Sequence, residues 1–282
     1  MSLAFVRHDQ LELPVTDISP DRLHIAGRLG VTAQATEGGI VLELLARPEV
    51  LHHGVVRISV LSFLVDAVAG IVVDTDPDAW ALTSDMSVRM RALPAPARIE
   101  ATGTVLRQGR RSTTSKVELV TGTGAPVATG AIGFATIARR EGDPPKPTLN
   151  TESAAAIFRG TASLAGPLRE VAGIEPLDPA NGEVEMAVTP QLRNPAGTLQ
   201  GAMVALLAEA AAEDLVSTRF ETPCVVTELD LRYLAQARVG PVRSRCRLLG
   251  TAPDSPVEIE LFDTSEERIT TLVYARATAV PG

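Results

Sequence analysis

Two stretches of the chain are apolar at nearly every position, and each follows a proline and a short turn. The first begins near Gly54 and ends near Val73, and the second begins near Gly197 and ends near Thr218. Helices on a protein surface carry a polar stripe, which both stretches lack. They are therefore predicted to be long helices that are buried on most of their faces.

Alternating apolar and polar residues predict strands before and after each helix. Turn signals such as Gly122-Thr123-Gly124 separate these strands. Strands are predicted over residues 40–45, 80–90, 97–107, 113–121 and 125–137, and again over 183–188, 223–234, 241–249, 257–263 and 269–279. One long helix with several antiparallel strands indicates an α+β fold in which a sheet wraps around its helix.

The two halves of the chain repeat each other, because the helix starts align without a gap. The aligned pairs are Gly54 with Gly197, Arg57 with Gln200, Ile58 with Gly201, and Asp66 with Glu209. The repeat of roughly 140 residues indicates a duplicated domain and not a solenoid. We expect domains over residues 1–138 and 166–282, joined by a linker and lead-in at 139–165 that starts with the polar, proline-rich stretch 139–147.

Composition narrows the choice of partners and location. The 282 residues are 45% hydrophobic, enough for two cores, and the formal charge of -8 argues against a nucleic-acid partner. The two cysteines, Cys224 and Cys246, lie in strand-like runs and are expected to be buried, reduced thiols. Neither a signal peptide nor a membrane span is expected, so the predicted location is the cytoplasm. All four histidines precede residue 54 and have no metal-ligand spacing, so no metal site is predicted.

The start of the second helix resembles a known motif, Asn-x-x-Gly-x-x-His/Gln-Gly-Gly/Ala followed about nine residues later by Asp or Glu. The residues that match it are Asn194, Gly197, Gln200, Gly201, Ala202 and Glu209. The first half matches weakly, with His52, Gly54, Arg57-Ile58-Ser59 and Asp66. The chain is thus similar to the hotdog-fold acyl-CoA thioesterases, of the PaaI-like and 4-hydroxybenzoyl-CoA thioesterase types. This resemblance implies two tandem hotdog domains, each a long helix wrapped by an antiparallel sheet, paired as the two subunits of a dimer would be.

The residues of the motif fit the chemistry of thioester hydrolysis. A helix start such as Gly201 offers free N–H groups and close approach to a carbonyl oxygen, and Asn194 and Gln200 carry amide donors. A carboxylate enclosed by apolar residues has a raised pKa, which suits a general base or nucleophile. The candidate catalytic residues are Asp66, Asn194, Gln200, Gly201 and Glu209.

The resemblance also implies that each acid faces the helix start of the other half. Asp66 would then meet Gly201, whereas Glu209 would meet Arg57 and Ile58, where no glycine allows close approach. We expect one working site around Asp66 and one decayed site around Glu209. Structural readings stay open: Asn194 as a helix cap, Glu209 as an ion-pair partner of Arg57, and the glycines as turn residues.

Further candidates concern substrate binding. They are Gly197, the equivalent strand residues Ser84 and Thr227, and the turn residues Arg107, Arg110 and Arg111. This basic turn has no counterpart in the second half and is a candidate for the phosphates of coenzyme A, or else a solvated hairpin.

The predicted function is hydrolysis of an acyl-CoA to the free acid and CoA, without a cofactor other than the CoA of the substrate. The alternative is a non-catalytic double-hotdog protein that binds acyl-CoA or an acyl chain. The sequence has neither a serine-hydrolase elbow nor a phosphate-binding loop. It also lacks the Asp-His pair of a hotdog hydratase, because Ile71 stands where the histidine would follow Asp66. Aromatic residues make up 3%, which favours an aliphatic acyl group, and a homodimer or larger homo-oligomer is expected.

Overall fold

The computed structural model describes residues 24–36, 39–143, 146, 153, 158–159 and 162–280. The first half contains one long helix and six main strands: β1 (Val31–Thr36), β2 (Gly39–Leu45), α1 (Ile58–Val73), β5 (Ala79–Met90), β6 (Arg98–Gln108), β7 (Ser112–Thr121) and β8 (Pro126–Ala138). The second half repeats this order: β9 (Ile174–Asp178), β10 (Glu183–Met186), α4 (Gly201–Phe220), β11 (Cys224–Tyr233), β12 (Val242–Leu248), β13 (Val257–Asp263) and β14 (Arg268–Ala279). A short helix, α3 (Leu168–Val171), precedes β9, and a two-residue hairpin of β3 (Leu51–His52) and β4 (Val55–Val56) precedes α1.

All twelve main strands form one antiparallel sheet, in which the two halves meet at its centre. The strand order is β1-β2-β6-β7-β8-β5-β11-β14-β13-β12-β10-β9, so the second half mirrors the first strand for strand. Strands β5 and β11 pair antiparallel across the junction, where Met86 lies opposite Leu231. The Arg89 guanidinium strengthens this junction, since it donates to the Asp230 carboxylate at 2.6 Å and to the Leu229 carbonyl at 3.2 Å.

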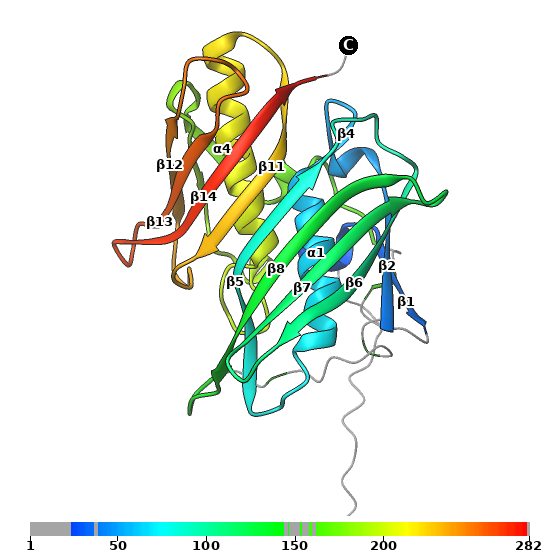
Figure 1. Cartoon of the computed structure of the whole chain (residues 1–282). Coiled ribbons are helices and arrows are strands. Elements are labelled where there is room, and N and C mark those ends of the chain that lie inside the picture. Colours follow the sequence, from blue (N-terminus) through cyan, green and yellow to red (C-terminus); the bar gives the residue numbers. More distant parts are fainter. Residues whose placement is uncertain are drawn as a thin grey trace, which may run out of the picture.

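The two long helices fill the hollow of the sheet, α1 against β5–β8 and α4 against β11–β14 (Figure 1). They also pack against each other, and their buried residues belong to one continuous apolar core. Close approach of α1 to the sheet depends on Gly130 of β8, where an added Cβ would stand 2.6 Å from the Val65 side chain. The apolar surface of both helices is thereby removed from water, which is the main favourable term in folding.

The α+β class and the strands predicted from alternation are confirmed, most of them to within one or two residues. The predicted helix starts are wrong by four residues, because Gly54 and Gly197 adopt φ values of +76° and +79° and belong to turns before the helices. The outer strands β1 and β9 were not predicted, and much of the predicted linker lies outside the described residues. Cys224 is buried and Cys246 partly buried, and both thiols are free, as expected.

Candidate active site

The two helices cross so that an acid of each, the partly buried Asp66 and the buried Glu209, lies at the first turn of the other. A Cβ placed on Gly201, the first residue of α4, would stand 3.8 Å from Oδ2 of Asp66 in α1. At the other crossing, the Glu209 carboxylate of α4 accepts from the backbone N–H groups of Ile58 and Ser59 at 3.1 and 3.3 Å. This is the crossed placement that the resemblance implied for Asp66 and Glu209.

The Asp66 carboxylate is held at one oxygen and faces α4 with the other. The Thr83 hydroxyl of β5 donates to Oδ1 at 2.6 Å, while Oδ2 is the atom nearest to Gly201. Burial raises the pKa of Asp66, and the Thr83 hydrogen bond opposes that rise only in part. A carboxylate that is poorly hydrated and anchored at one side is suited to accept a proton with its free oxygen.

The first turn of α4 presents donors to the same place. The N–H groups of Gly201 and Ala202 have no acceptor among the residues that the structure describes, as expected for the first turn of a helix. Gln200, the residue before the helix, is 9% exposed, and its Oε1 atom is buried without a partner in the described part of the chain. The partial positive charge of a helix start adds to the N–H groups of Gly201 and Ala202, so an oxyanion would be stabilised here. The Gln200 oxygen is an acceptor, and only the NH2 group of that side chain could add a donor.

The turn before α4 is fixed from within, and Asn194 takes part in it. The side-chain Oδ1 of Asn194 accepts from the Thr198 N–H at 3.1 Å, and its carbonyl accepts from the Gly197 N–H at 2.9 Å. Gly197 supplies the left-handed conformation that this turn requires. The side-chain oxygen of Asn194 thus stabilises the turn, which agrees with the structural role considered for this residue. Its side-chain NH2 group is the part that could still donate to a substrate.

Tyr233, at the end of β11, is the third group at this place. Its hydroxyl donates to the Gly201 carbonyl at 3.0 Å and lies 3.2 Å from the Cβ position of Gly201. Burial and the nearby Asp66 carboxylate raise the pKa of Tyr233 well above 10, so the phenol keeps its proton. Asp66, Gly201 and Tyr233 therefore converge on one small volume.

The second crossing is chemically different, because the Glu209 carboxylate is fully engaged. In addition to the two backbone N–H groups, the Ser59 hydroxyl donates to it and the Arg57 guanidinium lies 3.6 Å away. Arg57, which is 4% exposed, also contacts the Glu213 carboxylate at 3.0 Å. The two N–H groups that correspond to those of Gly201 and Ala202 are thus occupied by the protein's own acid.

A second acid and a histidine complete this buried cluster. Burial and the adjacent Glu209 raise the pKa of Glu213 to about 8, and burial together with Arg57 lowers the pKa of His52 to about 3. The His52 ring lies 3.4 Å from the Glu213 carboxyl group, but both groups are mainly uncharged at neutral pH, so this contact is not an ion pair.

The predicted substrate-binding residues of the strands do not reach Asp66. Ser84 lies at a bulge of β5 and donates to Asp85 at 2.8 Å. Thr227 lies at the equivalent bulge of β11, and its hydroxyl is 3.0 Å from that of Thr278. The two bulges confirm that these positions correspond in the repeat, but the neighbour Thr83 makes the contact to the acid.

The basic turn lies between β6 and β7, and Arg107, Arg110 and Arg111 are exposed there. The sheet register places Thr113, just after this turn, two strands away from Thr83, which is about 10 Å. Arg110 also borders a pocket of about 180 Å³, together with Asp74 and the indole of Trp80.

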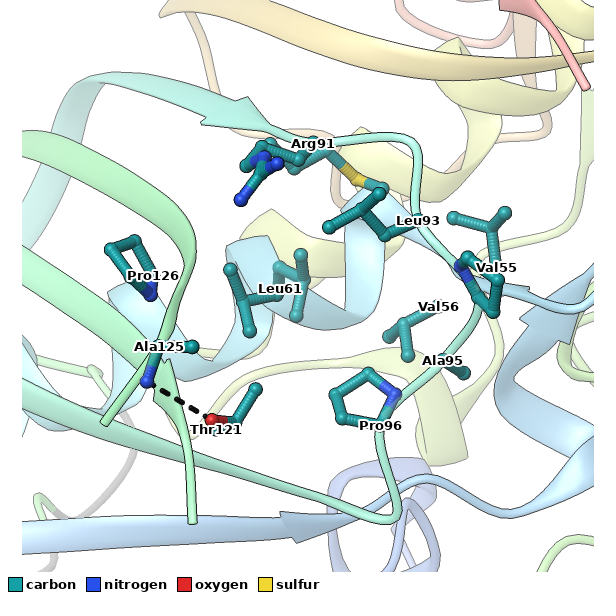
Figure 2. A pocket seen from close by; sticks show the side chains of 13 residues that line it. Val55, Val56, Leu61, Arg91, Leu93, Ala95, Pro96, Thr121, Ala125 and Pro126 are labelled. Atoms are coloured by element: carbon teal, nitrogen blue, oxygen red, sulfur yellow. Dashed lines mark hydrogen bonds between the residues drawn. The ribbon is translucent and has the colours of Figure 1, made fainter. Parts of the chain in front are cut away.

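An apolar pocket of about 110 Å³ lies at the start of α1 (Figure 2). Its walls come from the hairpin before α1, from α1 itself, from the segment after β5 and from the β7–β8 turn, with Val56, Leu61, Met90, Leu93 and Pro126 among them. In this view Leu61 lies at the centre, between Pro126 on the left and Val56 and Pro96 on the right.

Sequence reasoning missed Thr83 and Tyr233. The alternation Leu229, Leu231, Tyr233 continues the inward face of β11, so a phenol that needs a buried partner could have been found from the pattern. Thr83 could not, because the bulge at Ser84 shifts the inward face by one residue.

Within the described residues, no helix is long and apolar enough to cross a membrane, and no group of His, Cys, Asp and Glu side chains could hold a metal ion.

No protein-family model matches the sequence, and no curated protein is recognisably similar to it. Solved structures are similar in fold. The tesB protein of Mycobacterium avium subspecies paratuberculosis is 11% identical with a TM-score of 0.60, over 88% of this chain and 96% of that one. An acyl-ACP thioesterase from Bacteroides thetaiotaomicron is 11% identical with a TM-score of 0.56, over 84% and 97%. A protein of unknown function with a hotdog fold from Alicyclobacillus acidocaldarius is 12% identical with a TM-score of 0.55, over 92% and 99%. The chain therefore has the hotdog fold; identities this low say nothing further.

Proposed function

We propose that the protein is an acyl-CoA thioesterase with one active site per chain, built between its two halves. The observation that carries this proposal is the convergence of the Asp66 carboxylate with the first turn of α4 at Gly201. In this proposal the two halves pair as the subunits of a hotdog dimer do, and the acid and the oxyanion donors come from different halves. The names of the similar structures agree with this chemistry, although a fold alone does not fix an activity.

The reaction follows from these positions. The thioester carbonyl oxygen lies at the N–H groups of Gly201 and Ala202, with the amide of Gln200 beside it. Asp66 takes a proton from a water molecule as the water oxygen bonds to the carbonyl carbon, and the carbonyl π electrons move to the oxygen. When the carbonyl re-forms, the C–S bond breaks, its electron pair goes to sulfur, and Asp66 returns the proton to the thiolate. The products are the acid and CoA, and no cofactor is needed.

The basic turn suits the nucleotide end of CoA. Arg110 and Arg111 are exposed near the end of β5 that holds Thr83, so phosphates outside the site would meet guanidinium groups. The second half has no such turn, which agrees with a single site. We also propose that the chain self-associates as a homodimer or larger, which light scattering on the intact chain would test.

The crossing at Glu209 is proposed to be inactive, because its donors are already bonded to a carboxylate. Burial raises the pKa of Glu209, but both of its carboxylate oxygens accept hydrogen bonds from Ile58 or Ser59, so neither is left to take a proton from a water molecule. The residues of the repeat therefore take different roles, with Asp66 catalytic and Glu209 structural.

Hydrolysis of acyl-CoAs with two to twelve carbons, followed by release of free thiol, tests the proposal. We expect wild type to turn over at least one member of the panel, Asp66→Asn to lose at least 100-fold in kcat (roughly the effect of removing a general base), and Glu209→Gln to keep most of it. Thermal unfolding of each variant checks that the fold is intact. Saturable acyl-CoA binding without any turnover by wild type would instead favour a non-catalytic binding protein, and equal losses in both variants would refute the asymmetry.

A further inference from the structure

The two halves differ most sharply at the position that faces the first residue of the helix. In the repeat, Tyr233 of β11 corresponds to Met90 of β5, with the same spacing that relates Gly197 to Gly54. Tyr233 places its hydroxyl and ring carbon Cζ 3.2 and 3.6 Å from the Cβ position of Gly201. The space beside the first turn of α4 is therefore occupied by a phenol head.

The same region of the first half is open. Met90 lines the apolar pocket of about 110 Å³ at the start of α1, together with Val56 and Leu61, which are labelled in Figure 2. Their counterparts in the second half are Leu199 and Val204, both buried. Methionine at this position therefore leaves a pocket unfilled, and the volume of that pocket is enough for a few methylene groups.

We propose that Tyr233 limits the length of the acyl group, so that the site of Asp66 and Gly201 takes short-chain acyl thioesters. This inference rests on the proposed function, because it concerns the same site. The charged CoA portion extends toward solvent, so the acyl group is the part of the substrate that runs inward. Tyr233 continues the inward face of Leu229 and Leu231 and thus stands where that chain would go.

The phenol of Tyr233 is held in place, and rotating it aside costs free energy. Its hydroxyl is bonded to the Gly201 carbonyl at 3.0 Å, and turning away would leave a buried O–H without that partner. Because the group that holds it is the helix start itself, the wall and the oxyanion donors share one rigid element. The ring, and not the hydroxyl, sets the limit on length.

The chain-length profile of kcat/KM, from acetyl-CoA to dodecanoyl-CoA, tests this proposal. We expect wild type to favour acyl groups of six carbons or fewer. Tyr233→Met, which installs the first-half residue, is expected to move the optimum toward longer chains by two to four carbons, with a gain of about four-fold in kcat/KM for each methylene newly buried. Tyr233→Phe keeps the ring that forms the wall and removes its hydrogen bond to Gly201, so its optimum should stay closer to wild type than that of Tyr233→Met.

Met90→Tyr is the matched control in the other half. It fills the pocket of Figure 2, and the profile should not change. A shorter optimum in Met90→Tyr would instead place the acyl chain in that pocket and overturn the proposal. A wild-type optimum at ten or twelve carbons would also overturn the proposal, without the need for a variant. An unchanged optimum in a folded Tyr233→Met variant would overturn it as well. If wild type hydrolyses no member of the panel, the proposed function itself fails. That outcome is distinguishable from a failure of the length limit, in which wild type is active but prefers long chains.

Discussion

The buried carboxyl group of Glu213 should make the free energy of unfolding depend on pH, whether or not the protein is an enzyme. Glu213 is 2% exposed and shares one arginine, Arg57, with a second buried acid, Glu209. Two acids beside a single guanidinium cannot both ionise without a cost, since burial disfavours charge and like charges repel. We therefore consider Glu213→Gln, which keeps the shape of the side chain and removes its ability to ionise.

The magnitude follows from the pKa of Glu213, which is about 8 in the folded chain against 4.5 for an ordinary glutamate. Between these two pH values the folded chain holds a proton that the unfolded chain has released. The free energy of unfolding of wild type then falls by about 1.4 kcal/mol for each pH unit of increase from this group alone. From pH 5.5 to pH 7.5 the free energy of unfolding of wild type therefore falls by about 2.7 kcal/mol through Glu213. The Glu213→Gln variant does not undergo this fall, because its side chain does not ionise.

Urea unfolding of wild type and Glu213→Gln at pH 5.5, 6.5 and 7.5 would measure it. We expect the difference between the two to move in favour of the variant by about 2 to 3 kcal/mol across this range. Glu175→Gln, at an exposed glutamate of β9, is the control and should follow wild type within about 0.5 kcal/mol. Parallel curves for wild type and Glu213→Gln would refute the reasoning, because they would mean that Glu213 is ionised in the fold throughout.

Three further predictions concern charge. Arg57→Met should lower the free energy of unfolding by about 3 to 5 kcal/mol at pH 8, because it leaves two buried acids without their cation, whereas Arg247→Met, in an exposed ion pair, should stay close to wild type by the same urea assay. Exchange of both Arg110 and Arg111 for serine should raise KM for acyl-CoA several-fold but leave unchanged the hydrolysis of a truncated thioester without the nucleotide; an equal effect on both substrates would exclude a phosphate contact. The pKa of Asp66 is raised by burial and the base must be ionised, so kcat/KM should fall with decreasing pH at a value above that of an ordinary aspartate, and a profile flat down to pH 4 would contradict this role.

Much of the fold could be predicted from the sequence because duplication doubles each signal. Alternation in one half supported the strand assigned in the other, and the gapless alignment of Asp66 with Glu209 fixed which residues correspond. The helix starts could not be placed, because glycine signals a turn without saying how many extended residues separate that turn from the helix. The edge strand β9 escaped notice since it has mostly exposed residues, little alternation and a proline, Pro176. Strand β1 does alternate apolar and polar residues from Val31 to Thr36, so its pattern could have been recognised.

The candidate site was predicted less completely than the fold. The motif gave the helix start and the acid, because those residues are local in sequence. The contacts of Thr83 and Tyr233 are not local, and the first depends on a bulge that no pattern reveals. The roles of the two acids also depended on what each one meets in the other half, which is a property of packing.

One methylene group accounts for the different contacts of two equivalent acids. At position 209 the longer glutamate reaches the N–H groups of the opposite helix and is bonded there by Ile58 and Ser59. Aspartate at position 66 is shorter, is anchored by Thr83 at one oxygen, and leaves the N–H groups of Gly201 and Ala202 for another acceptor. An acid that satisfies the helix start stabilises the interface between the halves, and an acid that stops short of it leaves room for a reacting carbonyl. The proposed function needs both a firm interface and an open site, and a duplicated chain can give one crossing to each, which two identical subunits cannot do.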